Sequence, residues 1–253
     1  MNTTDISKSL SKLGLKRTDT VMIHGDAIVS TQLNLKKFEK DILNLYLDIL
    51  IDYFYPNGTI VIPTYTYNMT NNKVFDKYKS PSKIGLFSES FRIKQNVIRS
   101  NHPIFSVSSI GKFSKKLTNY NLEDCFGKNS FFDIFTKLDG KIVCMGCPLE
   151  RITYLHYVEQ KFKVDYRYLK KFSCAYREKN QIKKIKISYY VRDLNKSASL
   201  DFKFFSKKIK NIIKNSKFGR FNFSSIESKA LLKSSKLLIK KYPHILVGNK
   251  SEI

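Results

Sequence analysis

The sequence predicts one α/β domain with a mostly parallel central sheet, helices on both faces and antiparallel strands added in its C-terminal third. Short apolar runs alternate with stretches of helical spacing, turn residues separate them, and a period near two appears after Arg177. Such alternation is typical of a parallel sheet buried between helices. A chain of 253 residues can form one large domain. We expect residues 1–175 to be the α/β core and 176–253 a basic extension packed on it.

Three short apolar runs predict buried strands, and each lies beside turn residues. They span residues 20–24, 59–63 and 141–145. Apolar residues at helical spacing predict helices over 35–53, 131–135 and 230–241, and the alternating segment 182–189 predicts an exposed antiparallel strand. Ligands of such sheets bind beyond the carboxyl ends of the strands. We therefore expect the site near residues 24–26, 64–66 and 147–148.

The charge is strongly unbalanced, with 46 Lys and Arg against 21 Asp and Glu, a formal net charge of +25. A field of that sign favours anionic partners such as nucleic acid, an anionic membrane surface or phosphate-rich small molecules. Lys-rich codon usage would explain part of the excess but not the scarcity of carboxylates. The Phe residues interleaved with Lys after residue 201 also fit a basic nucleic-acid-binding protein. Core aromatics beside a solvated Lys face explain them more simply, so we expect no nucleic-acid partner.

Several function classes are excluded by missing patterns. There is no run of 18 apolar residues and no hydrophobic signal core at the start, which predicts a cytoplasmic protein without a membrane span. Hexapeptide repeats and the glycine fingerprints of P-loop and Rossmann proteins are also absent. The oligomeric state stays open, a dimer included.

Four cysteines occur in the chain, and Cys144 and Cys147 form a C-x-x-C pair. The pair ends a predicted buried strand, and no second Cys or His pair follows at the spacing of a zinc site. We therefore expect free thiols, no metal, and no redox chemistry.

Four segments together resemble the aminoglycoside 3-N-acetyltransferase family. They are residues 13–24, 58–67, 85–92 with 99–107, and 153–159. The most specific is R-S-x-H-P-x-x-S, formed by Arg99, Ser100, His102, Pro103 and Ser106. The resemblance covers about residues 10–170. It implies an enzyme that moves an acyl group from coenzyme A to an amine, without a metal.

The resemblance places the family's catalytic histidine at His156, which would take the proton of the attacking amine. Glu159 lies three residues on, on the same helical face, where it would orient the ring or hold the amine. The family usually has His-Ser-Ser where this chain has His24, Gly25 and Asp26. Asp26 is a second candidate to orient His156 or to bind the acceptor, with capping of a turn as the structural alternative.

Coenzyme A is expected to contact residues at the strand ends and in the specific motif. The resemblance implies a channel lined by Arg99, Ser100, Ser106 and Val107, with Arg99 pairing with phosphate. His24, Gly25 and Thr64 are expected to contact the donor as well, whereas His102 and Pro103 fit a fixed turn better than a catalytic pair. Tyr65 and Asp76 are candidates for acceptor binding.

The acceptor is the least determined part of the prediction. Aminoglycosides are polycations, and a field of +25 slows their approach. A nucleotide-linked amino sugar carries a negative diphosphate and one amine, so the charge favours that acceptor, as in surface-polysaccharide synthesis. An aminoglycoside remains the alternative, because net charge does not determine the potential inside one cleft, where Asp26, Asp76 and Glu159 would form an acidic pocket.

Overall fold

Side chains of the central strands alternate between two hydrophobic layers, which explains why helices cover both faces of the sheet. Strand β1 (Thr20–Gly25) sends Met22 into one layer and Val21 and Ile23 into the other. Strands β2 (Thr59–Pro63) and β6 (Lys141–Met145) divide in the same way. Successive side chains of a strand point to opposite faces, so a continuously apolar strand must be buried on both.

The computed structural model describes residues 1–33, 41–67, 73–196 and 201–247. Its remaining strands are β3 (Val74–Phe75), β4 (Ile98–Arg99), β5 (Val107–Gly111), β7 (Arg167–Glu178), β8 (Gln181–Arg192), β9 (Ile213–Phe218) and β10 (Phe221–Glu227). The α-helices are α1 (Thr3–Lys12), α2 (Ile42–Phe54), α3 (Leu86–Arg92), α4 (Ser114–Thr118), α5 (Phe131–Lys137), α6 (Tyr154–Lys161), α7 (Phe202–Lys208) and α8 (Ser228–Lys241). Three short 3₁₀ turns complete the described elements: η1 (Ala27–Gln32), η2 (Leu149–Arg151) and η3 (Lys210–Ile212).

The central sheet has seven strands in the order β4-β5-β2-β1-β6-β10-β9. The predicted parallel arrangement is confirmed in its middle, where β1 pairs in parallel with β2 and with β6. On one side β10 and β9 add antiparallel strands from the C-terminal third, as expected. On the other side β5 and β4 are antiparallel too, which the sequence pattern did not indicate. The predicted α/β fold class is confirmed.

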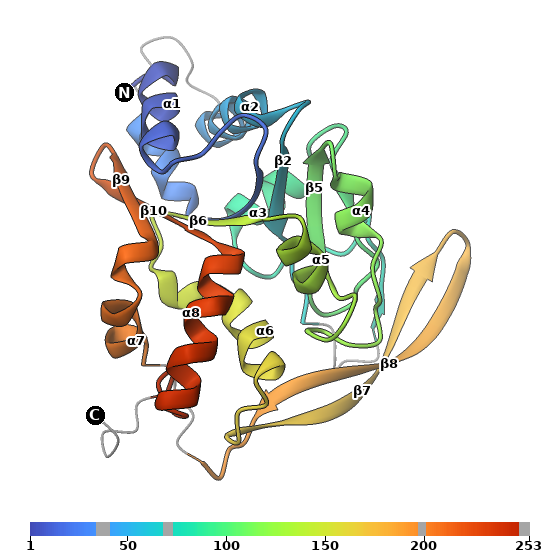
Figure 1. Cartoon of the computed structure of the whole chain (residues 1–253). Helices are drawn as coiled ribbons and strands as arrows, with labels where there is room; N and C mark the ends of the chain where they lie inside the picture. The colour runs from blue at the N-terminus through green and yellow to red at the C-terminus, as the bar shows by residue number, and fades with distance from the viewer. Residues whose placement is uncertain (34–40, 68–72, 197–200, 248–253) are drawn as a thin grey trace.

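Helices cover both faces of this sheet (Figure 1). Apolar residues of α1, α2 and α3 pack into one layer, and those of α5, α6 and α8 pack into the other. In the first layer Tyr46 and Phe87 are both at most 2% exposed, and in the second Phe135 and Leu155 are fully buried. The predicted helix over 35–53 corresponds to α2, while its first turn, with Phe38, lies outside the described residues.

A long antiparallel ribbon, β7–β8, extends from the body of the molecule (Figure 1). With β3 it forms a second, three-stranded sheet. The strand predicted at 182–189 is part of β8. Strand β7 crosses the expected boundary at residue 175, and β9 and β10 join the central sheet, so the core and the C-terminal segment share both sheets.

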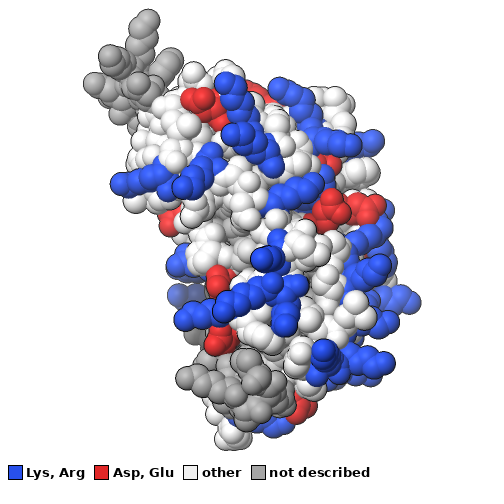
Figure 2. All heavy atoms as spheres, turned by 60° about the vertical axis from the view of Figure 1, so that its left-hand side comes forward, with Lys and Arg blue, Asp and Glu red and all other residues white. Residues whose placement is uncertain are grey.

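The basic residues are unevenly distributed along the chain. Residues 1–150 hold 20 Lys and Arg against 14 Asp and Glu, whereas residues 151–253 hold 26 against 7. Figure 2 shows Lys and Arg side chains spread over the side of the molecule that carries β9, α7 and α8. None of the described helices is long and apolar enough to cross a membrane.

Candidate functional site

The carboxyl ends of β1, β2 and β6 meet at one edge of the sheet, where a cavity of about 310 Å³ opens. Its wall is formed by three strand ends and the segments that follow them. The lining residues are Ile23, His24, Gly25, Pro63, Tyr65, Tyr67, Ile84, Ser88, Cys147, Arg151 and Thr153. This is the position predicted for the site of a doubly covered sheet.

Helix α6 begins directly after Thr153 of the cavity wall and presents a histidine and a carboxylate three residues apart, neither of which lines the cavity. His156 Nδ1 lies 2.8 Å from Glu159 Oε2, and the side chain of His156 is 22% exposed while that of Glu159 is fully buried. Arg167 at the start of β7 places its Nε 2.8 Å from the same carboxylate oxygen. The pairing predicted from the helical spacing is therefore present, and Arg167 adds a cation that sequence reasoning missed.

The electrostatics of this trio determine which imidazole nitrogen is free. Burial alone would raise the pKa of Glu159, but the hydrogen bond from His156 and the charge of Arg167 outweigh it and lower that pKa. An ionised carboxylate only accepts hydrogen bonds, so Nδ1 of His156 must carry the proton. Nε2 then has its lone pair available as a base.

Two contacts connect α6 to the cavity. The backbone N–H of His156 donates to the carbonyl of Thr153, which lines the cavity, and the ring of His156 lies 5.7 Å from that of Phe126. Phe126 in turn packs on Phe105 and, through it, on Tyr65 of the cavity wall. The start of α6 and the rings beside His156 thus pack on residues of the cavity wall.

Comparison with known proteins agrees with this geometry. The model of the aminoglycoside 3-N-acetyltransferase family matches residues 33–239. The chain belongs to this family. An aminoglycoside N(3)-acetyltransferase III of Acinetobacter baumannii is 39% identical over 62 residues, which are 24% of this chain and 22% of that protein.

A second relative matches over a longer stretch. Aminoglycoside N(3)-acetyltransferase VII of Streptomyces paromomycinus is 24% identical over 176 residues, 62% of this chain and 59% of its own length. The matched segments therefore cover between about a fifth and three fifths of these curated relatives. Among solved structures, one described as AAC-IIIb in binary complex with CoASH superposes with a TM-score of 0.78 and 20% identity, covering 99% of both chains. That likeness establishes the fold.

His24 is the fifth residue of β1, next to the carboxyl end of the strand. His24 lines the cavity, and its buried Nε2 has no hydrogen-bond partner among the described residues. Burial lowers the pKa of His24 to about 4, so the ring is neutral. Gly25 was expected to allow close approach of a ligand, but the ring of Phe87 occupies that space, since a Cβ on Gly25 would lie 2.6 Å from it.

Asp26 departs from the family's hydroxyl-bearing turn and has a structural contact. Its Oδ1 accepts a hydrogen bond from the backbone N–H of Ile28 at 3.2 Å and so caps η1. Of the two carboxylates predicted to orient His156, the structure therefore places Glu159 against the ring, while Asp26 takes the capping alternative.

The motif R-S-x-H-P-x-x-S forms a closed network instead of a channel wall. The Arg99 guanidinium donates to the carbonyls of Thr64, Lys77 and Ser80 and to the hydroxyl of Ser106, and its residue is only 7% exposed. Because these donors are already used inside the protein, the expected two-pronged contact with phosphate has no free donor edge. Burial lowers the pKa of Arg99 to about 9.

The other residues expected along the coenzyme A channel are buried beside Arg99. Ser106 donates to the Thr64 carbonyl at 2.8 Å, and Ser100 lies 2.9 Å from the Tyr120 hydroxyl while accepting from Val107 N. Thr64 and Val107 are fully buried, and none of these residues lines the cavity. Their hydrogen bonds in the structure are therefore to other parts of the protein, although Thr64 lies between Pro63 and Tyr65 of the cavity wall.

Of the two residues expected to bind the acceptor, one lines the cavity and the other does not. Tyr65, a candidate for acceptor binding, lines the cavity and is only 2% exposed. Burial raises the pKa of its hydroxyl. Asp76 accepts from the backbone N–H of Tyr78 at 2.9 Å and lies 3.5 Å from Arg177 of β7. It therefore fixes a turn and does not line the cavity.

His102 forms the fixed turn that the sequence predicts. Its Nδ1 accepts hydrogen bonds from the backbone N–H groups of Ile104 at 3.1 Å and Phe105 at 3.0 Å. Burial lowers the pKa of His102 to about 3, which keeps the ring neutral as this acceptor role requires. His102 therefore has a structural role.

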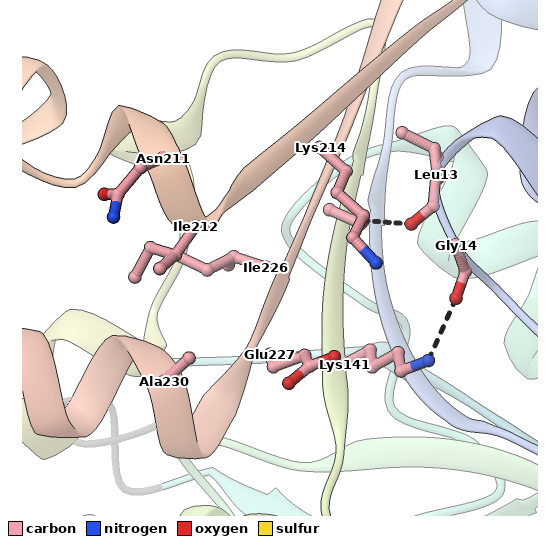
Figure 3. Close-up of a pocket in the computed structure, with 10 residues that line it drawn as sticks. Leu13, Gly14, Lys141, Asn211, Ile212, Lys214, Ile226, Glu227 and Ala230 are labelled. Atoms are coloured by element: carbon pink, nitrogen blue, oxygen red, sulfur yellow. Dashed lines mark hydrogen bonds between the residues drawn. The ribbon is translucent and has the colours of Figure 1, made fainter.

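A smaller cavity, of about 160 Å³, opens at the other edge of the sheet (Figure 3). Lys141, the first residue of β6, lies there and donates to the Gly14 carbonyl at 3.0 Å and to Asp19 at 2.7 Å. Glu227, before α8, lines the same space. This smaller cavity lies at the amino end of β6, whereas the first cavity lies at its carboxyl end. In the described part of the chain, no cluster of three or more His, Cys, Asp or Glu residues is arranged to hold a metal.

Proposed function

We propose that the chain is an N-acetyltransferase that moves an acetyl group from acetyl-CoA to an amine of an aminoglycoside. Family membership and the names of its relatives support this reaction. The observation that carries the proposal is the contact of 2.8 Å between His156 Nδ1 and buried Glu159, which leaves Nε2 available as a base.

The cavity fits the slender arm of a thioester donor. Its wall holds the buried Nε2 of His24, a polar atom without a partner among the described residues, and the cation of Arg151. A neutral imidazole can donate one hydrogen bond to an amide or carbonyl oxygen of such an arm. When bound, the donor supplies an acyl group activated as a thioester.

His156 performs the proton transfer. As the amine nitrogen bonds to the acyl carbon it must lose a proton, and Nε2 of His156 accepts it. The ring becomes an imidazolium, whose Nδ1–H stays on Glu159, so the charge that develops is stabilised by a buried carboxylate. Arg167 keeps that carboxylate ionised and in place. No covalent intermediate on the enzyme is required.

The acceptor proposal changes the preference that net charge alone suggests. The relatives are named for aminoglycosides, which favours the alternative over a nucleotide-linked amino sugar. Most of the excess positive charge belongs to residues 151–253, and much of it is spread over the β9, α7 and α8 side (Figure 2). The total of +25 therefore describes the whole surface and does not measure the potential at the cavity.

Thiol release from acetyl-CoA tests the reaction and the acceptor together. We expect turnover with aminoglycosides and none with a nucleotide-linked amino sugar at the same concentration. Turnover with the nucleotide sugar alone would restore the acceptor that the charge favours. Absence of release with both, together with no thermal stabilisation by coenzyme A, would reject the acyltransferase proposal. Saturation at about 100 times the dissociation constant should add about 2.7 kcal/mol to the free energy of unfolding.

A further inference from the structure

The C-x-x-C pair of the chain lies at the wall of the strand-end cavity. Cys144 is the fourth residue of β6 and is fully buried, whereas Cys147 is partly exposed and lines the cavity. Between them Gly146 adopts a positive φ of 71°, which bends the chain sharply after the strand. Cys147 packs against the apolar layer that contains Cys144, and the two thiols interact electrostatically. The Cys144 thiol lies 3.9 Å from the carbonyl of Pro148, the residue after Cys147.

The two thiols differ as the two members of a redox pair do. The neighbouring Cys144 thiol and the charge of Arg151 lower the pKa of Cys147 against the opposing effects of burial and of Asp26. The neighbouring Cys147 thiol, together with burial, raises the pKa of Cys144. Thiolate character and access make a cysteine reactive. Cys147 is thus suited to attack first, and Cys144 to complete the reaction from inside.

The other two cysteines provide a contrast within the same chain. Cys125 and Cys174 are 3% and 6% exposed, and both belong to the apolar layer that packs α5 and α6. Burial raises the pKa of both thiols. Neither has the combination of access and lowered pKa that Cys147 has, so they serve as internal controls for reactivity.

We propose that Cys144 and Cys147 form a redox-active dithiol, oxidised reversibly by a small-molecule disulfide such as glutathione disulfide. The Cys147 thiolate attacks one sulfur of glutathione disulfide, and one glutathione leaves as the thiolate. Cys144 then gives its proton to that thiolate and attacks the Cys147 sulfur, which releases the second glutathione. Two electrons pass from the pair to glutathione disulfide, which becomes two glutathione molecules.

Oxidation changes the wall of the cavity as well as the sulfur chemistry. In the reduced protein the Cys147 thiol donates to the backbone carbonyl of His24 at 3.2 Å, which links the end of β6 to the end of β1. A disulfide removes this donor and pulls Cys147 toward the buried strand. Since His24 and Cys147 line one cavity, we expect the oxidised protein to bind coenzyme A at least about tenfold more weakly, about 1.4 kcal/mol. This last expectation rests on the proposed function, whereas the dithiol itself does not.

The test is a redox titration of the folded full-length chain in glutathione buffers, followed by alkylation and peptide mapping. We expect a Cys144–Cys147 disulfide to form and to reverse on reduction. In the reduced protein Cys147 should be alkylated at least about tenfold faster than Cys125 or Cys174. A folded protein in which no such link forms, or in which only Cys125 and Cys174 become linked, would overturn the proposal.

Two variants separate the steps. With Cys144→Ala, the reaction should stop at a mixed disulfide of Cys147 with glutathione, which accumulates. With Cys147→Ser, glutathione disulfide should not react with Cys144, because Cys144 is buried. Acid quenching of the wild type at early times gives the same mixed disulfide if Cys144→Ala fails to fold. A protein that forms the disulfide but never binds coenzyme A would support the dithiol proposal and reject the acyltransferase proposal. Equal affinity of the oxidised and reduced proteins for coenzyme A would overturn the expected effect of oxidation on binding.

Discussion

Two polar clusters of this molecule are similarly buried but differ in what their hydrogen-bonding groups contact. The α6 cluster, His156 with Glu159 and Arg167, uses its buried charges to hold one ring while leaving the ring's Nε2 side partly exposed. The β4–β5 cluster, Arg99 with Ser106 and His102, directs its donors and acceptors to neighbouring backbone groups. The imidazole nitrogen left without a partner among the described residues therefore differs between the clusters: in the first it belongs to a partly exposed ring, whereas in the second the Nε2 of His102 is buried.

The largest effect is expected from His156→Ala. Loss of a general base lowers kcat by about 10²- to 10⁴-fold, and the affinity for coenzyme A should change little because other groups hold the donor. The limb of the pH–rate profile that reports imidazole deprotonation in the wild type should disappear. Steady-state kinetics and calorimetric binding measure both quantities.

His244→Ala is the matched control for this variant. His244 also lies against a carboxylate, with Nε2 2.9 Å from Asp165 Oδ1, and its side chain is 23% exposed, close to the 22% of His156. It follows α8, packs on Tyr166 and does not line the strand-end cavity, so turnover should persist. If His156→Ala folds and retains wild-type turnover, the base lies elsewhere, and the α6 cluster would be structural.

Glu159→Gln should lower kcat by about 10²-fold, the size of effect that a misplaced catalytic group produces. Removing the carboxylate charge also leaves Arg167 buried and unpaired, which costs about 3 kcal/mol of stability. The positioning role is distinguished from a purely structural one by kcat measured on the folded fraction of the variant. A variant that is less stable but has unchanged kcat would contradict this role.

Arg99→Met tests the structural role of the β4–β5 cluster. Several buried carbonyls lose their donor, so we expect the free energy of unfolding to fall by about 3 kcal/mol. The affinity for coenzyme A should hold, since the Arg99 donors already contact the protein. Arg99→Lys should lose nearly as much stability because an ammonium cannot match the planar fork. Weaker donor binding at unchanged stability would instead restore the phosphate contact expected from the sequence.

The sequence was most informative where the signal is local. The strands at residues 59–63 and 141–145 were predicted at the bounds that the structure has, because a short apolar run between turn residues needs no partner to be recognised. The antiparallel pairing of β5 with β2 was not predicted, because neither strand's own pattern says which neighbour it will meet. Strand pairing depends on contacts between segments far apart in the chain.

The same limit explains the site. His156 and Glu159 are three residues apart on one helix, so their contact follows from helical geometry. Arg167 comes from the next element, and nothing near it in sequence marks it as their partner. Arg99 was expected to pair with phosphate because the resemblance implies that it lines the coenzyme A channel, whereas its partners in the structure include the carbonyl of Thr64, 35 positions away. An arginine's partners cannot be read from its motif alone.

The smallest predicted effect is a pH dependence of stability that arises from neutral, buried histidines. His102 has a pKa of about 3 in the folded chain against an ordinary value of 6.5, because burial disfavours the charged ring. The unfolded chain therefore binds the proton first, so this contribution to stability is complete above pH 6.5 and is lost as the pH falls toward 3. At pH 5 the loss is about 2 kcal/mol for this one residue. His24, with a pKa of about 4, acts in the same direction.

Denaturant unfolding between pH 8 and 5 should show this decline in stability in the wild type and a shallower decline in His102→Gln, even if that variant is less stable throughout. The buried carboxylate of the α6 cluster, Glu159, has a pKa below its ordinary range and titrates at lower pH, so it does not obscure this window. An identical slope in both proteins would mean that the folded state accepts a proton on His102, and that the β4–β5 cluster is more open than its hydrogen bonds indicate.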